Sequence, residues 1–249
     1  MGLTIKEQIA RERLRESKPK VYDKIIKYDE RLLQRKSCAV IQIQGGYSCN
    51  FACEHCAISK FQGRKQARLT PEALKMFCDQ ADAYRLAQID FSGGEPLTFK
   101  NLDDCISAIG ADRFFLQIDT NGMLMTEDKI KYLKALGVDK IKIGFDSFIE
   151  AEHDKFRNMS GSYKAILRAI EAINKHGLIL QFATVATPQR IYTQEFENYL
   201  TFADLCGARV NVLMPKLSGE WQGRYDLLFN DVDTQKLNEI LDHHIDAGW

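Results

Sequence analysis

Three cysteines fall close together in the stretch YSCNFACEHC, residues 47–56. Cys49, Cys53 and Cys56 are separated by three and then by two residues. Thiols at this spacing can converge on one compact metal site, and reduced cysteines suit either zinc or an iron–sulfur cluster. The stretch therefore predicts a metal site.

The number of cysteines bears on which metal fits. A structural zinc needs four ligands, and His55, the available fourth, lies between two of the cysteines and would have to fold back. A plain ferredoxin cluster needs four cysteines. The remaining cysteines are scattered and are predicted to be core residues: Cys38, Cys78, Cys105 and Cys206. Three cysteines on a cubane cluster leave one iron without a protein ligand, which is typical of a catalytic metal site.

The elements that would position these thiols alternate along the chain. From Ala39 onward, short β-rich runs alternate with runs of helical period, which predicts a parallel sheet of β-α units. The expected strands are Ala39–Ile43, Gln88–Phe91, Phe114–Asp119, Lys140–Phe145, Leu178–Ala183 and Ala208–Met214. One apolar helical stripe consists of Tyr163, Ile166, Leu167, Ile170 and Ile173. Two charged helices, Ile5–Glu16 and Lys20–Gln34, are expected before the sheet.

Polar and glycine-rich segments follow the predicted strands. In parallel sheets of this kind, functional loops lie at the carboxyl ends of the strands. Four such loops carry the cysteine stretch, Ser92-Gly93-Gly94-Glu95-Pro96, Thr120-Asn121-Gly122 and Asp146-Ser147. We therefore expect these residues to meet at one edge of the sheet.

Composition narrows the class of protein. The chain has 249 residues, 45% of them hydrophobic and 27% charged, which fits a globular protein with one main domain. A net charge of zero predicts no general attraction to nucleic acid or membrane. The absence of a spanning segment or signal pattern in the sequence predicts a cytoplasmic location. Residues 1–36 carry eleven Lys/Arg against six Asp/Glu, which we interpret as a solvated helix face, with an acidic partner as the alternative.

The motifs resemble those of the radical S-adenosylmethionine (radical SAM) superfamily. The cysteine spacing, with His55 before the last cysteine, is similar to the superfamily signature. Gly93-Gly94-Glu95-Pro96 is similar to its methionine-binding segment, and Thr120-Asn121-Gly122 to its third-strand loop. Residues 146–163 resemble the branch with molybdenum-cofactor cyclases, sulfatase maturases and peptide-modifying enzymes. The resemblance covers about residues 38–216.

This resemblance implies a fold, cofactors and a reaction. The fold would be α/β, a partial (β/α)6 barrel at residues 38–249 with a helical N-terminal extension at residues 1–37. Cys49, Cys53 and Cys56 would bind three irons of a 4Fe-4S cluster, and SAM would chelate the fourth. The reduced cluster would cleave SAM and a radical would abstract hydrogen from a peptide or small-molecule substrate. Flavodoxin or ferredoxin would be the electron donor, with no nucleic-acid or membrane partner.

The resemblance also implies contacts with SAM. The expected SAM-binding residues are His55, Gly93, Gly94, Glu95, Pro96, Thr120, Asn121, Asp146 and Met214. Glu95 would face the ammonium group and His55 the adenine. Many relatives have a serine on the fourth strand where this chain has Gly144, so Ser147 or Asp119 would have to contact the ribose instead.

Other interpretations remain open at this point. A glycyl-radical-enzyme activase has similar cysteine spacing and length, and a zinc or electron-transfer module would not cleave SAM. For His153 and Arg157 we favour structural roles, in helix capping or ion pairing, over contact with a substrate.

Overall fold

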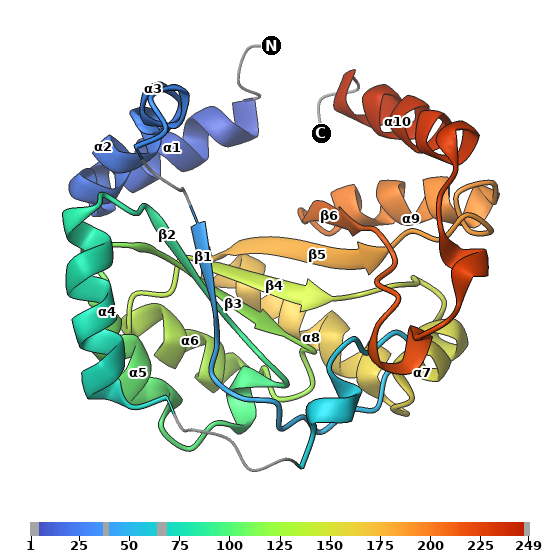
Figure 1. The fold of residues 1–249 in the computed structure, drawn as a ribbon, viewed down its shortest axis with the longest axis horizontal. Coiled ribbons are helices and arrows are strands. Elements are labelled where there is room, and N and C mark those ends of the chain that lie inside the picture. The colour runs from blue at the N-terminus through green and yellow to red at the C-terminus, as the bar shows by residue number, and fades with distance from the viewer. Residues whose placement is uncertain (1–4, 37–39, 64–68, 247–249) are drawn as a thin grey trace.

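The chain folds around one parallel sheet (Figure 1). The computed structural model describes residues 5–36, 40–63 and 69–246. Six strands lie side by side in the order of the sequence. They are β1 (Val40–Gln44), β2 (Gln88–Ser92), β3 (Phe115–Thr120), β4 (Lys140–Gly144), β5 (Ile179–Val185) and β6 (Arg209–Leu213). The six predicted strands and the partial α/β barrel are confirmed, with strand bounds shifted by one or two residues.

Helices cover the outer side of the curved sheet (Figure 1). Over the described residues the helices are α1 (Ile5–Ser17), α2 (Pro19–Ile26), α3 (Tyr28–Leu33), α4 (Pro71–Ala83), α5 (Leu102–Ile109), α6 (Glu127–Ala135), α7 (Glu150–Arg157), α8 (Ser162–Lys175), α9 (Gln194–Leu205) and α10 (Asp231–Asp246). At the start of α4, the Thr70 hydroxyl accepts a hydrogen bond from the backbone N–H of Ala73 at 3.2 Å. This cap and Pro71 fix where the helix begins.

The core lies between the sheet and these helices. Residues at alternate strand positions, such as Ile141 and Phe182, pack against α8 and its neighbours. One part of the predicted α8 stripe is wrong, because Leu167 is 37% exposed. The buried face of α8 includes the small residues Ala165 and Ala169 beside the predicted isoleucines.

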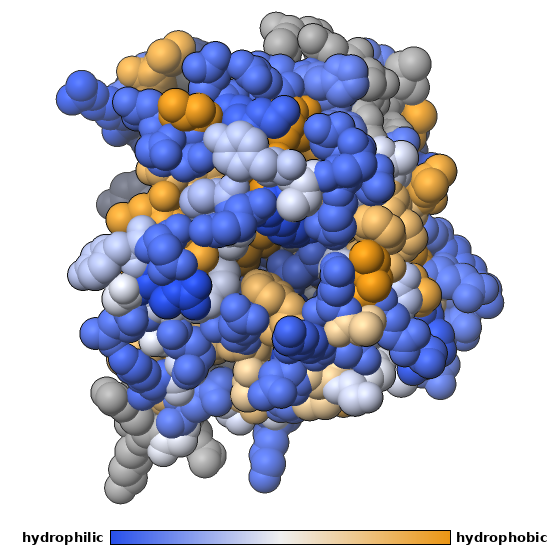
Figure 2. Space-filling view, turned by 90° about the vertical axis from the view of Figure 1, so that its right-hand side faces the viewer, coloured by the Kyte–Doolittle hydropathy of each residue, from blue (hydrophilic) through white to orange (hydrophobic). Residues whose placement is uncertain are grey.

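The cysteines outside the cluster stretch largely behave as predicted. Cys78 and Cys105 are buried in the core, and half-buried Cys206 packs against its edge. Cys38 lies outside the described residues. Within the described part of the chain, every helix is too short or too polar to cross a bilayer. On the face shown in Figure 2, hydrophobic residues are scattered among hydrophilic ones.

The N-terminal extension has three helices where two were expected. Lys27 ends α2 and begins α3, with a backbone (φ −92°, ψ 2°) outside the helical range. The Lys18 ammonium lies 2.5 Å from a carboxylate oxygen of Asp139, and the Lys24 ammonium lies 2.5 Å from one of Asp82. Part of the local positive charge therefore ties the extension to the barrel. The predicted boundary at residues 37 and 38 lies outside the described residues and stays a prediction.

Candidate active site

A cavity of about 500 Å³ opens at the carboxyl ends of the strands. Most of the predicted site residues line it: Cys49, Cys53, His55, Cys56, Gly93, Gly94, Thr120, Asn121, Asp146 and Met214. Segments far apart in the sequence therefore meet, as the position of their loops predicted. Glu95 and Pro96 do not line the cavity, and both are buried.

The three clustered thiols are half-buried and close enough to influence one another. Burial raises the pKa of the Cys49 and Cys53 thiols, and the other thiols of the cluster add to the rise. Nearby N–H groups oppose this rise in pKa. The backbone N–H of Phe51 donates to the Cys49 sulfur at 3.4 Å, and the Arg157 guanidinium bonds to Cys53. These donors would stabilise thiolates bound to a metal.

The arrangement fits a cluster better than a single metal ion. Among the described residues, no three His, Cys, Asp or Glu side chains converge closely enough for one ion. In a cubane cluster each cysteine binds a different iron, so its ligands stand further apart. The His55 ring stacks on Phe156, with 4.8 Å between the ring centroids. Burial, aided by Arg157, lowers the pKa of His55 to about 4, so the ring is neutral.

The glycine pair lies against the cysteine loop. The backbone N–H of Gly94 donates to Gly46 at 2.8 Å, and that of Glu95 donates to Ser48 at 2.8 Å. A Cβ atom on Gly94 would lie 2.0 Å from the Ser48 carbonyl oxygen. Gly93 has a φ of +141°, and a Cβ atom there would lie 2.4 Å from the Gly46 carbonyl oxygen. Both positions require glycine because two backbones meet there.

Glu95 holds the loop after β3. One carboxylate oxygen accepts from the Thr120 hydroxyl at 2.7 Å, and the other accepts from the Asn121 backbone N–H at 2.7 Å. Burial raises the pKa of this carboxyl, and the hydrogen bonds oppose that rise. The contacts of Glu95 and Pro96 with SAM stay a prediction, and neither residue lines the cavity. Glu95 therefore supports the cavity wall through Thr120 and Asn121.

A buried ion pair forms the opposite wall of the cavity. The Arg157 guanidinium lies 2.5 Å from one oxygen of Asp146, and the other oxygen accepts from the Val185 backbone N–H at 3.1 Å. Burial opposes ionisation of Asp146, but Arg157 and Arg190 outweigh it and lower its pKa. Arg190 also donates to the Asp146 carbonyl oxygen at 2.5 Å. Asp146 is thus an anion at neutral pH, with its charge already paired.

Gly144 makes room for Arg157. A Cβ atom on Gly144 would lie 2.4 Å from a guanidinium nitrogen of Arg157. A serine hydroxyl at this position would compete with the guanidinium for one space. Of the two substitutes, Asp119 lines the cavity, whereas the Ser147 hydroxyl turns away and donates to Glu152 at 2.9 Å.

The ion pair predicted for Arg157 is present, whereas His153 makes a hydrogen bond in place of a helix cap or an ion pair. His153 is fully buried and accepts from the Asp146 backbone N–H at 3.3 Å, and burial lowers its pKa to about 4. Arg157 pairs with Asp146 and also lines the cavity, which the sequence interpretation missed.

The strands themselves contribute lining residues that the motifs did not indicate. They include Gln42, Gln44, Lys142 and Asn211. The signal was present as polar residues at alternate positions of otherwise apolar strands, in VIQIQ and KIKIG. In a strand such positions share one face of the sheet.

Comparison with protein families matches residues 43–202 to the profile described as the Radical SAM superfamily. An AdoMet-dependent heme synthase of Methanosarcina barkeri is 30% identical over 152 residues, which is 60% of this chain and 43% of the relative. A PqqA peptide cyclase of Gluconobacter oxydans is 26% identical over 132 residues, covering 53% of this chain and 37% of the relative. The chain thus spans less than half the length of these curated relatives.

Solved structures show the same fold. Streptococcus suis SuiB bound to precursor peptide SuiA superposes with a TM-score of 0.70 at 14% sequence identity. The superposition covers 91% of this chain and 51% of the SuiB chain. At this identity the likeness concerns the fold alone.

Proposed function

Because the chain belongs to the radical SAM superfamily of enzymes, whose cofactors are a 4Fe-4S cluster and SAM, we propose that this cavity binds both cofactors. The observation that carries the proposal is the meeting of Cys49, Cys53 and Cys56 with the glycine loop and the Asp146–Arg157 pair around one space. When bound, the cluster would supply an electron that cleaves SAM to a radical able to abstract hydrogen from a substrate.

We assign the three cysteines as cluster ligands. Phe51, Asn121 and Arg157 would donate N–H hydrogen bonds to their sulfurs; the Asn121 amide lies 3.9 Å from the Cys49 sulfur. Donors of this kind stabilise negative charge on a metal–sulfur centre and shift its reduction potential.

We assign the other lining residues to SAM. The exposed backbone of Gly93 and Gly94 would approach the methionyl group closely, since neither carries a side chain. Thr120 and Asn121 lie on the cavity wall and would contact SAM there. His55 and Met214 offer apolar surface to SAM, and Asp146 offers a hydrogen-bond acceptor. Glu95 would hold Thr120 and Asn121 in place through its hydrogen bonds, and Glu95 and Pro96 stay predicted SAM-binding residues of their loop. The aromatic packing of His55 would exclude water.

We further propose that the substrate is a peptide or small metabolite and that flavodoxin or ferredoxin supplies the electron. The relatives named as a heme synthase and a peptide cyclase support both substrate types. Free thiols at Cys78 and Cys105 suit a reducing compartment, which supports a cytoplasmic location.

The proposal is tested by anaerobic reconstitution with iron and sulfide, reduction with dithionite, and quantification of 5′-deoxyadenosine after addition of SAM. We expect the wild-type chain to form this product and Cys53→Ala to form none. Cys206→Ala, which removes a thiol outside the cavity, is the matched control and should form it as the wild type does. A cluster-loaded wild-type sample that leaves SAM intact would overturn the proposal.

A further inference from the structure

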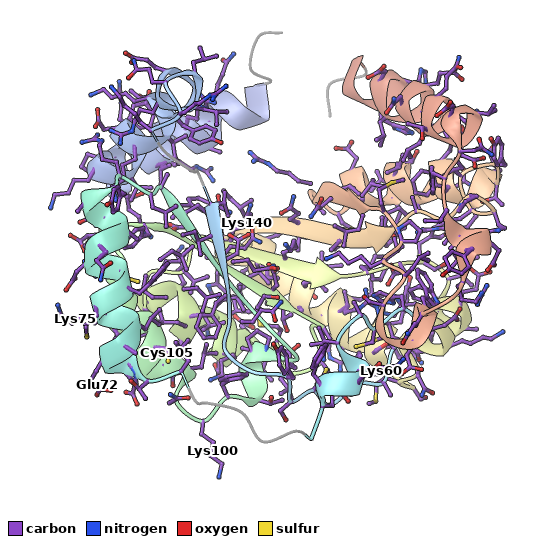
Figure 3. The ribbon with its side chains drawn as sticks, viewed as in Figure 1. Lys60, Glu72, Lys75, Lys100, Cys105 and Lys140 are labelled. Atoms are coloured by element: carbon purple, nitrogen blue, oxygen red, sulfur yellow. The ribbon has the colours of Figure 1, made fainter. Side chains whose placement is uncertain are left out.

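The segment that follows β6 lies against the cysteine loop (Figure 1). Its residues 217–222 include the short 3-10 helix Gly219–Trp221, which packs beside a second one, Ser59–Phe61. Lys60, labelled in Figure 3, comes from that second helix, and its ammonium donates a hydrogen bond to the Gln222 side-chain oxygen. All of residues 217–222 lie beyond residue 202, where the family match ends.

Two backbone contacts join this segment to Cys56. The backbone N–H of Glu220 donates to the Cys56 carbonyl oxygen at 3.1 Å. A Cβ atom on Gly219, whose φ is +62°, would lie 2.0 Å from the same oxygen. Only glycine fits where two backbones approach so closely. The place of Cys56 therefore depends on Gly219 as well as on the cysteine loop itself.

The Trp221 side chain covers the outer side of the same loop. It is 3% exposed, and its ring centroid lies 5.9 Å from that of His55 and 6.2 Å from that of Phe156. Val185 and Leu227 complete a small hydrophobic cluster around it. The indole is thus held on several sides against the histidine that separates two of the clustered cysteines.

Trp221 also borders two cavities. It lines the cavity at the carboxyl ends of the strands and a second cavity of about 450 Å³, and Cys53 lines both as well. Glu220 and Arg224, which line only the second cavity, are exposed, so this cavity reaches the protein surface. The indole therefore stands beside a path by which water could approach Cys53.

We propose that Gly219 and Trp221 are positioning residues of the cofactor site. Gly219 fixes the backbone of Cys56, and Trp221 shields Cys53 from water that enters the second cavity. The inference rests on the proposed function, since it gives both residues a role toward the cluster that the cysteines would bind. Solvent access around a metal–sulfur centre affects its stability and its reduction potential.

The role of Trp221 is tested by labelling thiols in the reduced, metal-free protein. A short pulse of N-ethylmaleimide alkylates accessible thiols, and peptide mapping by mass spectrometry measures the rate at each cysteine. We expect Trp221→Ala to raise the rate at Cys53 severalfold, because loss of the indole opens the second cavity onto the sulfur. Trp221→Phe, which keeps an aromatic ring, should stay close to the wild type. An unchanged rate at Cys53 in Trp221→Ala would overturn the shielding role.

Leu227→Ala is the matched control for the indole. Leu227 belongs to the same hydrophobic cluster but lines neither cavity, so we expect the wild-type rate at Cys53. An equal acceleration in Leu227→Ala would show general loosening and contradict the proposal. The buried thiols of Cys78 and Cys105 report global unfolding. If Trp221→Ala exposes them, Trp221→Leu, which removes less volume, takes its place in the comparison.

The role of Gly219 is tested with a second glycine of similar backbone conformation. Gly223 has a φ of +85°, but a Cβ atom there meets no atom within 4 Å. Gly219→Ala and Gly223→Ala therefore share the backbone strain, and only the first displaces Cys56. We expect severalfold faster labelling of Cys56 in Gly219→Ala and the wild-type rate in Gly223→Ala. Equal rates at Cys56 in the two variants would overturn the positioning role.

The cluster-loaded protein supplies an independent measurement. We expect Trp221→Ala to lose iron to the chelator bathophenanthroline disulfonate severalfold faster than the wild type, Trp221→Phe and Leu227→Ala. Equal rates of iron loss would contradict the shielding of the cluster. The labelling needs no cluster, which separates the two proposals. A chain that binds no iron removes the proposed function, whereas unchanged labelling in a chain that cleaves SAM removes this inference alone.

Discussion

The two halves of the sheet build their sides of the cavity by different means. Beside β1 to β3, the cysteine and glycine loops are joined backbone to backbone, at Gly94 and Glu95. Beside β4 to β6, the wall is a buried ion pair between Asp146 and Arg157, braced by Arg190. The first half depends on the absence of side chains, and the second depends on long charged side chains that balance each other.

The largest effect is expected from the cysteine loop of the first half. Cys53→Ala removes one of the three proposed ligands, and we expect the reconstituted protein to lose its bound iron, measured by iron analysis and visible absorbance. No substitution of Asp146 or Arg157 should abolish iron binding to the same degree. Full iron occupancy in Cys53→Ala would contradict the prediction that iron binding depends on the first half.

The second half should show the larger effect on folding. Asp146→Ala leaves the Arg157 guanidinium buried without its partner, and we expect a loss of about 3–5 kcal/mol in the free energy of unfolding. Urea denaturation of the metal-free protein measures it. Asp226→Ala, in an exposed ion pair with Arg224, is the control and should leave the midpoint unchanged. A small loss in Asp146→Ala would mean that the pair does not support this wall.

Two glycine substitutions sharpen the comparison directly. Gly94→Ala places a methyl group 2.0 Å from a backbone oxygen, whereas Gly144→Ala places it 2.4 Å from the end of the Arg157 side chain. Overpacking costs about 1–3 kcal/mol, and a side chain yields more readily than a backbone. We expect Gly94→Ala to be the more destabilised in urea, with Gly144→Ala instead changing the environment of Arg157. The opposite ranking would contradict the account of the glycine loop.

The smallest expected effect is a difference in pH dependence. The pKa of Glu95 is raised above its ordinary 4.5, so its contribution to stability falls as pH rises through 4.5 toward the folded value. The pKa of Asp146 is lowered below 3.8, so its contribution is present above 3.8 and is lost as pH falls through the folded value.

Substitution of each carboxyl residue tests these opposite pH dependences of stability. Relative to wild type, Glu95→Gln should gain stability as pH rises from about 4 to 7, while Asp146→Asn should lose stability as pH rises from about 2 to 4. Denaturation midpoints of the metal-free proteins across this range test both. Parallel curves for wild type and Glu95→Gln would show that burial does not raise the pKa of Glu95.

The first half of the site was predictable from sequence because its residues are contiguous and chemically distinctive. Three spaced cysteines and a glycine pair after a strand can be recognised without knowing their neighbours. The hydrogen bonds of Glu95 were not predictable, because only the fold brings Thr120 and Asn121 to its carboxylate. The strand order followed from the β-α alternation, because consecutive parallel strands in such units lie side by side.

The second half was less predictable because it depends on distances between separate helices and strands. Arg157 reaches Gly144 and Asp146 only after α7 has folded against β4, and a charged helix residue ordinarily lies in solvent. The polar lining had a signal in the alternation of KIKIG, but its inward direction follows only from the curvature of the sheet. The burial of the α8 alanines was likewise not predicted, because a pattern of large hydrophobic residues does not include them.

The central claim is that three cysteines of this cavity leave one iron of a 4Fe-4S cluster for SAM. It is tested most directly by the electron paramagnetic resonance spectrum of the reduced, cluster-loaded protein, recorded with and without SAM. We predict that SAM changes the spectrum, because it binds the iron that has no cysteine. A cluster spectrum that saturating SAM leaves unchanged would contradict the account.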